Sequence, residues 1–251
     1  MNIVLLTALG VGGATVIGSV IGFAFKKLSH RFSDIILSFA AGVMLCAAVF
    51  GLVLPSIDEN NASSVFVSIA GIACGALLLN IMDKLVPHLH RISGNDIESH
   101  GENNEKLGKV LLFVMAIAIH NLPEGIAAGV GFGTGNTAEA ITIAGGIALQ
   151  NIPEGMVIIA PMLAVGMSKK RTFLVASFTG IVEVLGTFLG YFAVSVSSVI
   201  LPFALSFAGG TMLYVISDEM IPETHHEGSR GVTWALLIGF SLMLIMDVYL
   251  G

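Results

Sequence analysis

The chain has 251 residues, of which 55% are hydrophobic and only 11% are charged, whereas about 25% of the residues of an average soluble domain are charged. About 20 apolar residues are needed for each membrane crossing, and with a mean hydropathy of +0.92 this length accommodates eight crossings and short loops. A soluble enzyme is therefore excluded. The net charge of −6 argues against a nucleic-acid partner, because nucleic acids bind basic surfaces.

Apolar runs between charged residues, or between breaks rich in Pro and Asn, predict the membrane-spanning helices. The first run follows no Lys or Arg and is about 23 residues long, so it is interpreted as a span rather than as a cleaved signal sequence. We expect an all-α integral membrane protein in which residues 1–251 form a single transmembrane domain. The eight predicted spans are residues 3–25, 34–54, 64–86, 108–131, 137–163, 172–197, 199–222 and 232–250.

The 11 basic residues surround the loops that follow the first, third, fifth and seventh spans. Because Lys and Arg are retained in the cytoplasm, these loops are predicted to be cytoplasmic, including the His-bearing loop 87–107. Both termini are then predicted to face outward. The loops at 55–63 and 133–136 contain no Lys or Arg, as this orientation requires.

Segments far apart in the chain repeat each other. SFAAGVML at Ser38–Leu45 matches SFAGGTML at Ser206–Leu213, and GSVIG at Gly18–Gly22 matches GTFLG at Gly186–Gly190, both at an offset of 168 residues. The first three spans thus resemble the last three, and since the two members of each matched pair are five spans apart in chain order, the second copy is inverted in the bilayer. Chance similarity among helices rich in Gly, Ala and Leu is the alternative. It is disfavoured because Ile-Met-Asp also recurs, in the third and eighth spans.

The fourth and fifth spans carry a second duplication, HNLPEG at residues 120–125 and QNIPEG at residues 150–155. One reversal of the chain separates the two motifs, so they run antiparallel. Together with the outer repeats they predict a 3+2+3 inverted-repeat arrangement. Such an arrangement is typical of secondary transporters, whose substrate sites lie near the midplane where the repeats meet.

The two motifs place polar side chains near the middle of the bilayer. A carboxylate at that depth is unfavourable by about 2.5–3.5 kcal/mol on insertion scales, so a compensating partner is expected. Helical spacing puts His120 and Glu124 on one face of their span, and Gln150 and Glu154 on one face of the next. These four side chains are therefore candidate ligands.

Pro123 and Pro153 each remove a hydrogen bond to a carbonyl one turn earlier, so each is expected to kink its helix and to free a carbonyl oxygen. With Asn121 and Asn151 included, the two helices present two carboxylates, one imidazole and three amides to a shared cavity, which suits a divalent cation. Without thiolates the set favours zinc, iron(II), manganese or cobalt over copper(I). The alternative is a pair of proline kinks held by interhelical amide bonds.

Glu183 is an isolated charge in the sixth span, among Phe, Val, Leu, Gly and Thr. Its counterpart in the N-terminal repeat is Thr15, so the helical scaffold does not require a charge at this position. That asymmetry indicates a functional role. The alternative is a protonated Glu183 that is hydrogen-bonded in a helix interface.

Charged residues near the ends of the spans are candidate entrance and exit sites. Asp83, Asp218 and Glu219 form a candidate exit cluster at the cytoplasmic end, whereas Asp58 and Glu59 either attract cations at the outer face or keep the turn hydrated. Histidines of the cytoplasmic loops belong either to solvated polar loops or to weak metal-capture sites. These are His88, His90, His100, His225 and His226.

The paired HNLPEG and QNIPEG motifs in adjacent central spans resemble the signature of the ZIP (Zrt-, Irt-like) family of metal transporters, closest to its bacterial, GufA-like branch. The resemblance covers the whole chain. It implies two adjoining metal sites that are bridged by glutamates. The first is implied to consist of His120, Glu124, Gln150 and Glu154, and the second of Asn121, Asn151 and Glu183.

The same resemblance implies a homodimer in the cell (inner) membrane and an elevator-like sliding of spans 1, 4, 5 and 6 against spans 2, 3, 7 and 8. It also places the exit residues of the branch at the acidic group of Asp83, Asp218 and Glu219. Many members carry His or Asp where this chain has Gln150 or Asn151. This departure favours a broader metal range over high selectivity for zinc.

We therefore predict a transporter, without a cofactor, that takes up divalent metals toward the cytoplasm: zinc first, with iron(II), manganese, cobalt and cadmium as further candidates. An intramembrane metallohydrolase fits less well, because the chain has no HExxH motif and a single intramembrane histidine. A proton-coupled carrier of an organic solute, with Glu124 and Glu154 as the relay, needs aromatic residues around its cavity. Phe113 and Phe132 are the only aromatic residues at the two central spans.

Overall fold

The computed structural model describes residues 2–25, 29–58, 61, 63–92, 101–196, 198–225 and 230–251. These residues form helices joined by short turns, and no strand occurs among them. The elements in chain order are α1 (Asn2–Ala24), α2 (His30–Cys46), the π-helical η1 (Ala47–Val53), η2 (Leu54–Ser56), α3 (Ser64–Ile92), α4 (Gly101–Val130), η3 (Gly131–Thr134), α5 (Thr137–Ala164), α6 (Lys169–Val196), η4 (Ser198–Ile200), α7 (Leu201–Val215), the π-helical η5 (Ile216–Met220), α8 (Ile221–Thr224) and α9 (Arg230–Leu250).

The all-α membrane architecture expected from the sequence is confirmed. Seven helical runs of the described residues are long and apolar enough to cross a membrane. The remaining predicted span, residues 108–131, lies in α4, a helix of 30 residues that begins with charged turns and carries the motif at residues 120–125 in its second half. The chain is therefore a multi-pass membrane protein.

The outward faces of the helices are apolar. Phe66 on α3 and Trp234 on α9 are 71% and 65% exposed, and many exposed Leu, Ile and Val side chains accompany them. Apolar patches of this extent are rare on soluble monomers, whereas a lipid bilayer covers them. Small buried residues such as Ala40 and Ala127 fill much of the interior, so the helices approach one another closely.

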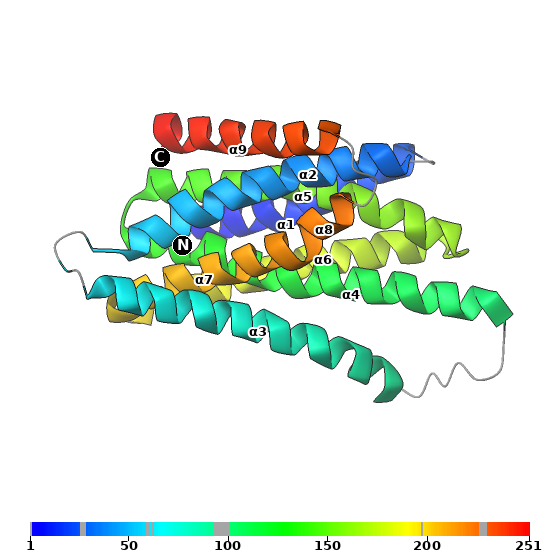
Figure 1. Ribbon diagram of the computed structural model, residues 1–251, viewed down its shortest axis with the longest axis horizontal. Helices are drawn as coiled ribbons and strands as arrows, with labels where there is room; N and C mark the ends of the chain where they lie inside the picture. Colours follow the sequence, from blue (N-terminus) through cyan, green and yellow to red (C-terminus); the bar gives the residue numbers. More distant parts are fainter. Residues whose placement is uncertain are drawn as a thin grey trace.

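The helices lie side by side along the long axis of the molecule (Figure 1). Helices α1, α4, α5 and α6, which we call the motif bundle, pack mainly as α4 on α6 and as α1 on α5 and α6. The other four long helices, which we call the flanking helices, pack as α2 on α9 and as α3 on α7. Contacts of α2 with α5 and of α4 with α7 join the two sets.

The two ends of the chain lie at the same end of the bundle (Figure 1). The C-terminal end of α3, the beginning of α4 and the connection from α5 to α6 lie at the opposite end. The π-helical η5 and the short α8 lead from the middle of the molecule toward that opposite end.

The reversal between the two motif helices has clear local causes. Gly135 has φ 79°, a left-handed conformation that glycine adopts without a steric penalty. The side chain of Asn136 then accepts hydrogen bonds from the backbone N–H groups of Ala138 and Glu139, which caps the start of α5. As a result α4 and α5 lie antiparallel, and both stay helical through Pro123 and Pro153.

The glycine that ends each motif sets how closely the motif helices pack. Gly125 faces the backbone carbonyl of Glu183 in α6, and Gly155 faces that of Thr15 in α1. A side chain at either position would collide with backbone atoms, which cannot move aside as a flexible side chain can. The two motifs are thus held against α6 and α1 in equivalent ways.

The sequence did not predict the two π-helical segments. η1 continues α2 and precedes Pro55, while η5 continues α7 and precedes Pro222. Proline cannot donate a backbone hydrogen bond to the preceding turn, and both prolines follow a widened turn. Such π turns inside α-helices are frequent at functional sites, and η5 carries two of the predicted exit residues.

Candidate metal-transport site

The structure brings the seven predicted midplane residues together in the interior of the motif bundle. His120, Asn121 and Glu124 come from α4, their counterparts Gln150, Asn151 and Glu154 come from α5, and Glu183 comes from α6. All seven are buried, His120 being the most accessible at 6%. Polar groups at this depth require partners, so their contacts indicate what the site can bind.

Glu183 lies at the centre of a hydrogen-bonded cluster. The amide nitrogen Nδ2 of Asn121 donates to its Oε1 at 2.5 Å, and that of Asn151 donates to its Oε2 at 2.7 Å. The hydroxyl of Thr15 donates to Oε1 at 2.8 Å. Asn121, Asn151 and Glu183, which resemblance to the family implies as the second metal site, are therefore in contact with one another. Thr15 joins them, although the sequence had indicated it only as the uncharged counterpart of Glu183.

A second pair links the two motifs directly. The side-chain nitrogen Nε2 of Gln150 donates to Oε1 of Glu124 at 2.8 Å, and both side chains are fully buried. Because Gln150 and Glu124 belong to different motifs, this hydrogen bond joins α4 to α5 at the level of the site.

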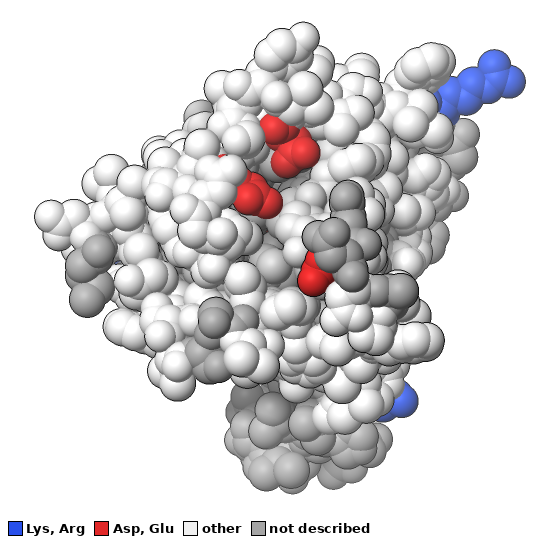
Figure 2. All heavy atoms as spheres, turned by 90° about the vertical axis from the view of Figure 1, so that its left-hand side faces the viewer, with Lys and Arg blue, Asp and Glu red and all other residues white. Residues whose placement is uncertain are grey.

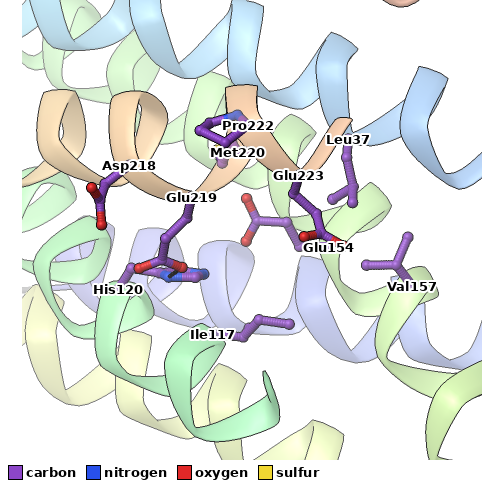
Figure 3. A pocket seen from close by; sticks show the side chains of 10 residues that line it. All are labelled: Leu37, Ile117, His120, Glu154, Val157, Asp218, Glu219, Met220, Pro222 and Glu223. Carbon is purple, nitrogen blue, oxygen red and sulfur yellow. Dashed lines mark ion pairs between the residues drawn. The ribbon is translucent and has the colours of Figure 1, made fainter. Parts of the chain in front are cut away.

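Glu154 and His120 lie on the other side of the site, at a cavity of about 280 Å³ between the motif bundle and η5 and α8. In Figure 3 the carboxylates of Glu154, Glu219 and Glu223 are directed into this cavity, with His120 beside Glu219 and Asp218 at its edge. The ring nitrogen Nδ1 of His120 lies 3.3 Å from Oε2 of Glu219. The lining residues are Leu37, Ile117, His120, Glu154, Val157, Asp218, Glu219, Met220, Pro222 and Glu223.

Six buried oxygens of the two motifs have no hydrogen-bond partner. They are Oδ1 of Asn121 and of Asn151, Oε2 of Glu124, Oε1 of Gln150, and both carboxylate oxygens of Glu154. Burying an acceptor oxygen without a donor costs free energy. A bound cation removes this cost, because it takes the place of the missing donors. Oxygen donors of this kind, with one imidazole beside them, suit hard and borderline divalent cations.

The carboxylates and the imidazole of the site are spread apart in this structure. Among the described residues, no three His, Cys, Asp or Glu side chains lie close enough together to hold one metal. Glu154 faces the cavity, whereas Glu124 bonds to Gln150 and is not part of the cavity lining. The cavity thus reaches one half of the predicted site and stops before the other.

Of the predicted exit residues, Asp218 and Glu219 line the cavity. The side chain of Asp83 lies outside the described part of the molecule. Glu223, one residue beyond the predicted span 199–222, lies in α8 and also lines the cavity. The sequence contained an indication of this position. Glu219 and Glu223 are four residues apart, so they share a face if the helix continues past Pro222.

Acidic groups lie at the end of the molecule where the two chain termini are found (Figure 1). Figure 2 views this end of the molecule and shows Asp and Glu among uncharged atoms, with Lys and Arg at the rim of the view. Asp58 exchanges backbone hydrogen bonds with the hydroxyl of Ser64 at the start of α3, and Glu59 lies outside the described residues. An entrance role for this pair stays a prediction.

The predicted metal-capture histidines are mostly outside the described part of the chain. This holds for His100 and His226, and for the side chains of His88 and His90. Nδ1 of His225 is within hydrogen-bond distance of the backbone oxygen of Ile221, at 2.9 Å, so this ring closes the end of α8. Metal capture by these histidines stays a prediction.

Known proteins resemble the chain over nearly its whole length. A family model described as "ZIP Zinc transporter" matches residues 86–247. The chain is 38% identical to the zinc transporter GufA of Myxococcus xanthus over 98% of both chains. It is 36% identical to the zinc transporter ZIPB of Bordetella bronchiseptica, over 95% of this chain and 78% of that protein. It is 31% identical to the zinc transporter ZupT of Chlorobaculum parvum, over 95% of this chain and 94% of that protein.

These matches confirm the resemblance that the central motifs predicted, including the likeness to bacterial members. They also agree with the helical membrane architecture described above. The chain belongs to the ZIP family of zinc transporters, a family of multi-pass membrane transporters rather than enzymes.

Proposed function

We propose that this chain moves divalent metal ions, zinc first among them, across a membrane toward the cytoplasm through the polar interior of α4, α5 and α6. The observation that carries the proposal is the set of six buried acceptor oxygens without a hydrogen-bond partner. Family membership adds support, since the relatives are named as zinc transporters. Those names lend no support to a metallohydrolase or a carrier of organic solutes.

The site is proposed to hold two adjoining ions. One binds among His120, Glu124, Gln150 and Glu154, and the other binds beside Glu183 and the two motif asparagines. The hydrogen bonds support this division, because Gln150 bonds to Glu124 and both asparagines bond to Glu183. When an ion binds, the amide side chains turn their oxygen atoms toward it and stop donating to the carboxylates. Glu124 and Glu183 are then free to coordinate the ion.

The metal range is proposed to extend from zinc to iron(II), manganese, cobalt and cadmium. Imidazole and carboxylate suit zinc, whereas amide and carboxylate oxygens suit harder ions. Neutral amide oxygens hold an ion less tightly than thiolates do, so the ion can leave again. Reversible binding of this kind is needed for transport.

The inverted 3+2+3 arrangement is supported by equivalent contacts in the two halves of the chain. Gly18 in α1 faces the backbone carbonyl of Ile152 in α5, and Gly186 in α6 faces that of Leu122 in α4. Ile152 and Leu122 occupy the same place in the two central motifs. With the basic loops in the cytoplasm, both termini are proposed to lie outside.

An elevator-like movement of the motif bundle against the flanking helices is supported by the kinds of contact that glycines make. Within the flanking helices Gly42 faces a backbone carbonyl of α9. Across the boundary between the two sets, Gly51 of η1 and Gly146 of α5 face the side chains of Ile143 and Met243 instead. Side chains adjust as helices slide, whereas backbone contacts hold them. The homodimer implied by resemblance to the family stays a prediction.

The cavity beside Glu154 is proposed as the exit path. It joins the motif residues His120 and Glu154 to Glu219 and Glu223, so an ion that leaves the site meets successive carboxylates. Exchange from ligand to ligand avoids release of a bare ion in a region of low dielectric constant, which is strongly unfavourable.

The test is metal entry into liposomes that contain the purified protein. Zinc, iron(II), manganese and cadmium are followed under an imposed gradient, with protein-free liposomes as the blank. We expect entry with the native chain and none above the blank when Glu124→Ala is combined with Glu154→Ala. Glu139→Ala, which removes a carboxylate from the first turn of α5, is the matched control. Entry that survives the double substitution contradicts the site assignment.

A further inference from the structure

Thr15 makes a contact that three other buried hydroxyls of the motif bundle do not make. Its hydroxyl crosses from α1 to α6 and donates to Oε1 of Glu183 at 2.8 Å, and both side chains are fully buried. The hydroxyls of Ser19, Thr179 and Thr187 are also buried, but they donate to backbone carbonyls of their own helices. Compared with these three, Thr15 is thus directed at a functional group.

The two motif asparagines hold Glu183 in a different way. Nδ2 of Asn151 donates to Oε2 of Glu183 at 2.7 Å and to the backbone carbonyl of Val11 at 3.3 Å, which uses both amide hydrogens. Oδ1 of Asn151 and Oδ1 of Asn121 have no hydrogen-bond partner. Each asparagine can therefore stop donating to the carboxylate of Glu183 and coordinate an ion through its side-chain oxygen instead. The carboxylate must keep its position while this change takes place.

The backbone of α1 fixes the position of Thr15 relative to α5. Gly155 of the second motif faces the carbonyl of Thr15, and Gly18, one turn further along α1, faces the carbonyl of Ile152. Such backbone contacts leave little room for α1 to shift against α5. The hydroxyl of Thr15 is consequently a donor in a fixed place, and groups that orient a metal ligand in this way commonly affect affinity by about 10- to 100-fold.

We propose that Thr15 is a positioning residue for the transported ion. Its hydroxyl holds Oε1 of Glu183 while the ion displaces the asparagine hydrogens, so that Oε2 is presented to the ion in one orientation. The inference rests on the proposed function, in which Glu183 is a metal ligand. The two repeats then contribute unlike groups at equivalent positions: the second repeat supplies the acid, and the first supplies the donor that orients it.

The experiment measures initial rates of zinc entry into liposomes over a range of zinc concentrations, giving KM and the maximal rate. Thr15→Val keeps the shape of the side chain and removes its donor. We expect KM to rise about tenfold while the maximal rate per folded protein changes less than KM. Thr15→Ser, which restores a hydroxyl, is expected to return KM to within about twofold of the native value.

Thr179→Val is the matched control, because it removes a buried hydroxyl at another position in the same bundle, one that donates only to the carbonyl of Ala176 in its own helix. Its KM is expected to equal that of the native chain. The unfolding temperature is recorded for every variant, so that a loss of packing is separated from a loss of affinity. If Thr15→Val does not fold, Thr15→Cys replaces it, since a thiol is a weak donor of similar size, and a rise in KM is again expected.

Two results distinguish failure of this inference from failure of the proposed function. If Glu183→Gln impairs zinc entry but Thr15→Val leaves KM at the native value, Thr15 is not a positioning residue, even if its unfolding temperature falls. An equal rise in KM for Thr15→Val and Thr15→Ser also overturns the inference. If Glu183→Gln transports zinc as the native chain does, the assignment of Glu183 as a ligand is itself wrong.

Discussion

The two central motifs have almost the same sequence, yet their glutamates lie in different surroundings. Glu124 is fully buried and accepts a hydrogen bond from Gln150. Glu154 lines the cavity beside His120, and neither of its carboxylate oxygens has a hydrogen-bond partner. Because the two residues occupy equivalent positions in the duplication, the difference arises from the groups that surround them. The cavity therefore reaches Glu154 but does not reach Glu124.

The first residue of each motif accounts for part of this asymmetry. Gln150 is long enough, and has the donor, to reach across to Glu124 within the motif bundle. His120 instead lies 3.3 Å from Glu219 of the flanking segment η5. Gln150 thus links α5 to α4 inside the motif bundle. His120, at the equivalent position, contacts the segment that continues α7, one of the helices against which the bundle is proposed to slide.

The largest expected effect comes from removing the charge that faces the cavity. Glu154→Gln keeps the shape of the side chain but no longer balances the charge of the ion, so zinc entry into liposomes should fall about 100-fold. Since the carboxylate of Glu154 makes no hydrogen bond, the unfolding temperature should not decrease. Glu139→Gln in the same helix serves as the control. Native rates of zinc entry with Glu154→Gln contradict the prediction.

The packing of the two motifs should be equivalent even though their glutamates are not. Gly125→Ala and Gly155→Ala each push a methyl group into a backbone carbonyl, and overpacking of this kind lowers the free energy of unfolding by about 1–3 kcal/mol. Gly145→Ala in α5, where the nearest atom is a methionine methyl at 3.6 Å, should be tolerated. Thermal unfolding in detergent measures all three. Equal stability of Gly155→Ala and Gly145→Ala refutes the packing account.

Making the motifs identical at their first position should change metal preference. Gln150→His adds an imidazole, which favours zinc over harder ions, so the ratio of zinc entry to manganese entry should rise about fivefold. His120→Gln should lower the same ratio. Competition between zinc and manganese in one liposome preparation measures it. If both substitutions move the ratio in the same direction, the first motif position does not set selectivity.

The smallest expected effect concerns the part of the cavity that α8 lines. Glu223→Gln removes a carboxylate that lines the proposed exit path without belonging to a motif. The maximal rate should therefore fall by about two- to threefold while KM stays constant, as for a charge that is partly solvated. A rise in KM without a change in maximal rate places Glu223 in the binding step instead.

Much of the architecture follows from local features of the sequence. Apolar runs of sufficient length predicted the membrane helices, and the reversal at Gly135 and Asn136 places the two motifs side by side. The midplane residues were predicted because polar groups are costly at that depth, and all seven are buried in the motif bundle. These features depend on periodicity and on the cost of burial, which a single sequence displays directly.

Other features depend on contacts between distant segments, which local patterns do not reveal. The bond between Thr15 and Glu183 joins residues 168 positions apart, and the place of Glu223 depends on continuation of the helix beyond Pro222. The π-helical segments result from hydrogen-bond shifts along α2 and α7. Which glutamate faces the cavity depends on contacts between the helices, and the single difference between His120 and Gln150 at the first motif position does not reveal those contacts.

The most direct test of the central claim is to locate the ion itself. Crystals of the native chain grown with zinc are examined for anomalous scattering at the zinc absorption edge. The account predicts a peak between α4 and α5, at about 2.0–2.2 Å from a carboxylate oxygen of Glu154 and a ring nitrogen of His120. A map with zinc only at the loop histidines, and with the bond between Gln150 and Glu124 unchanged, would contradict it.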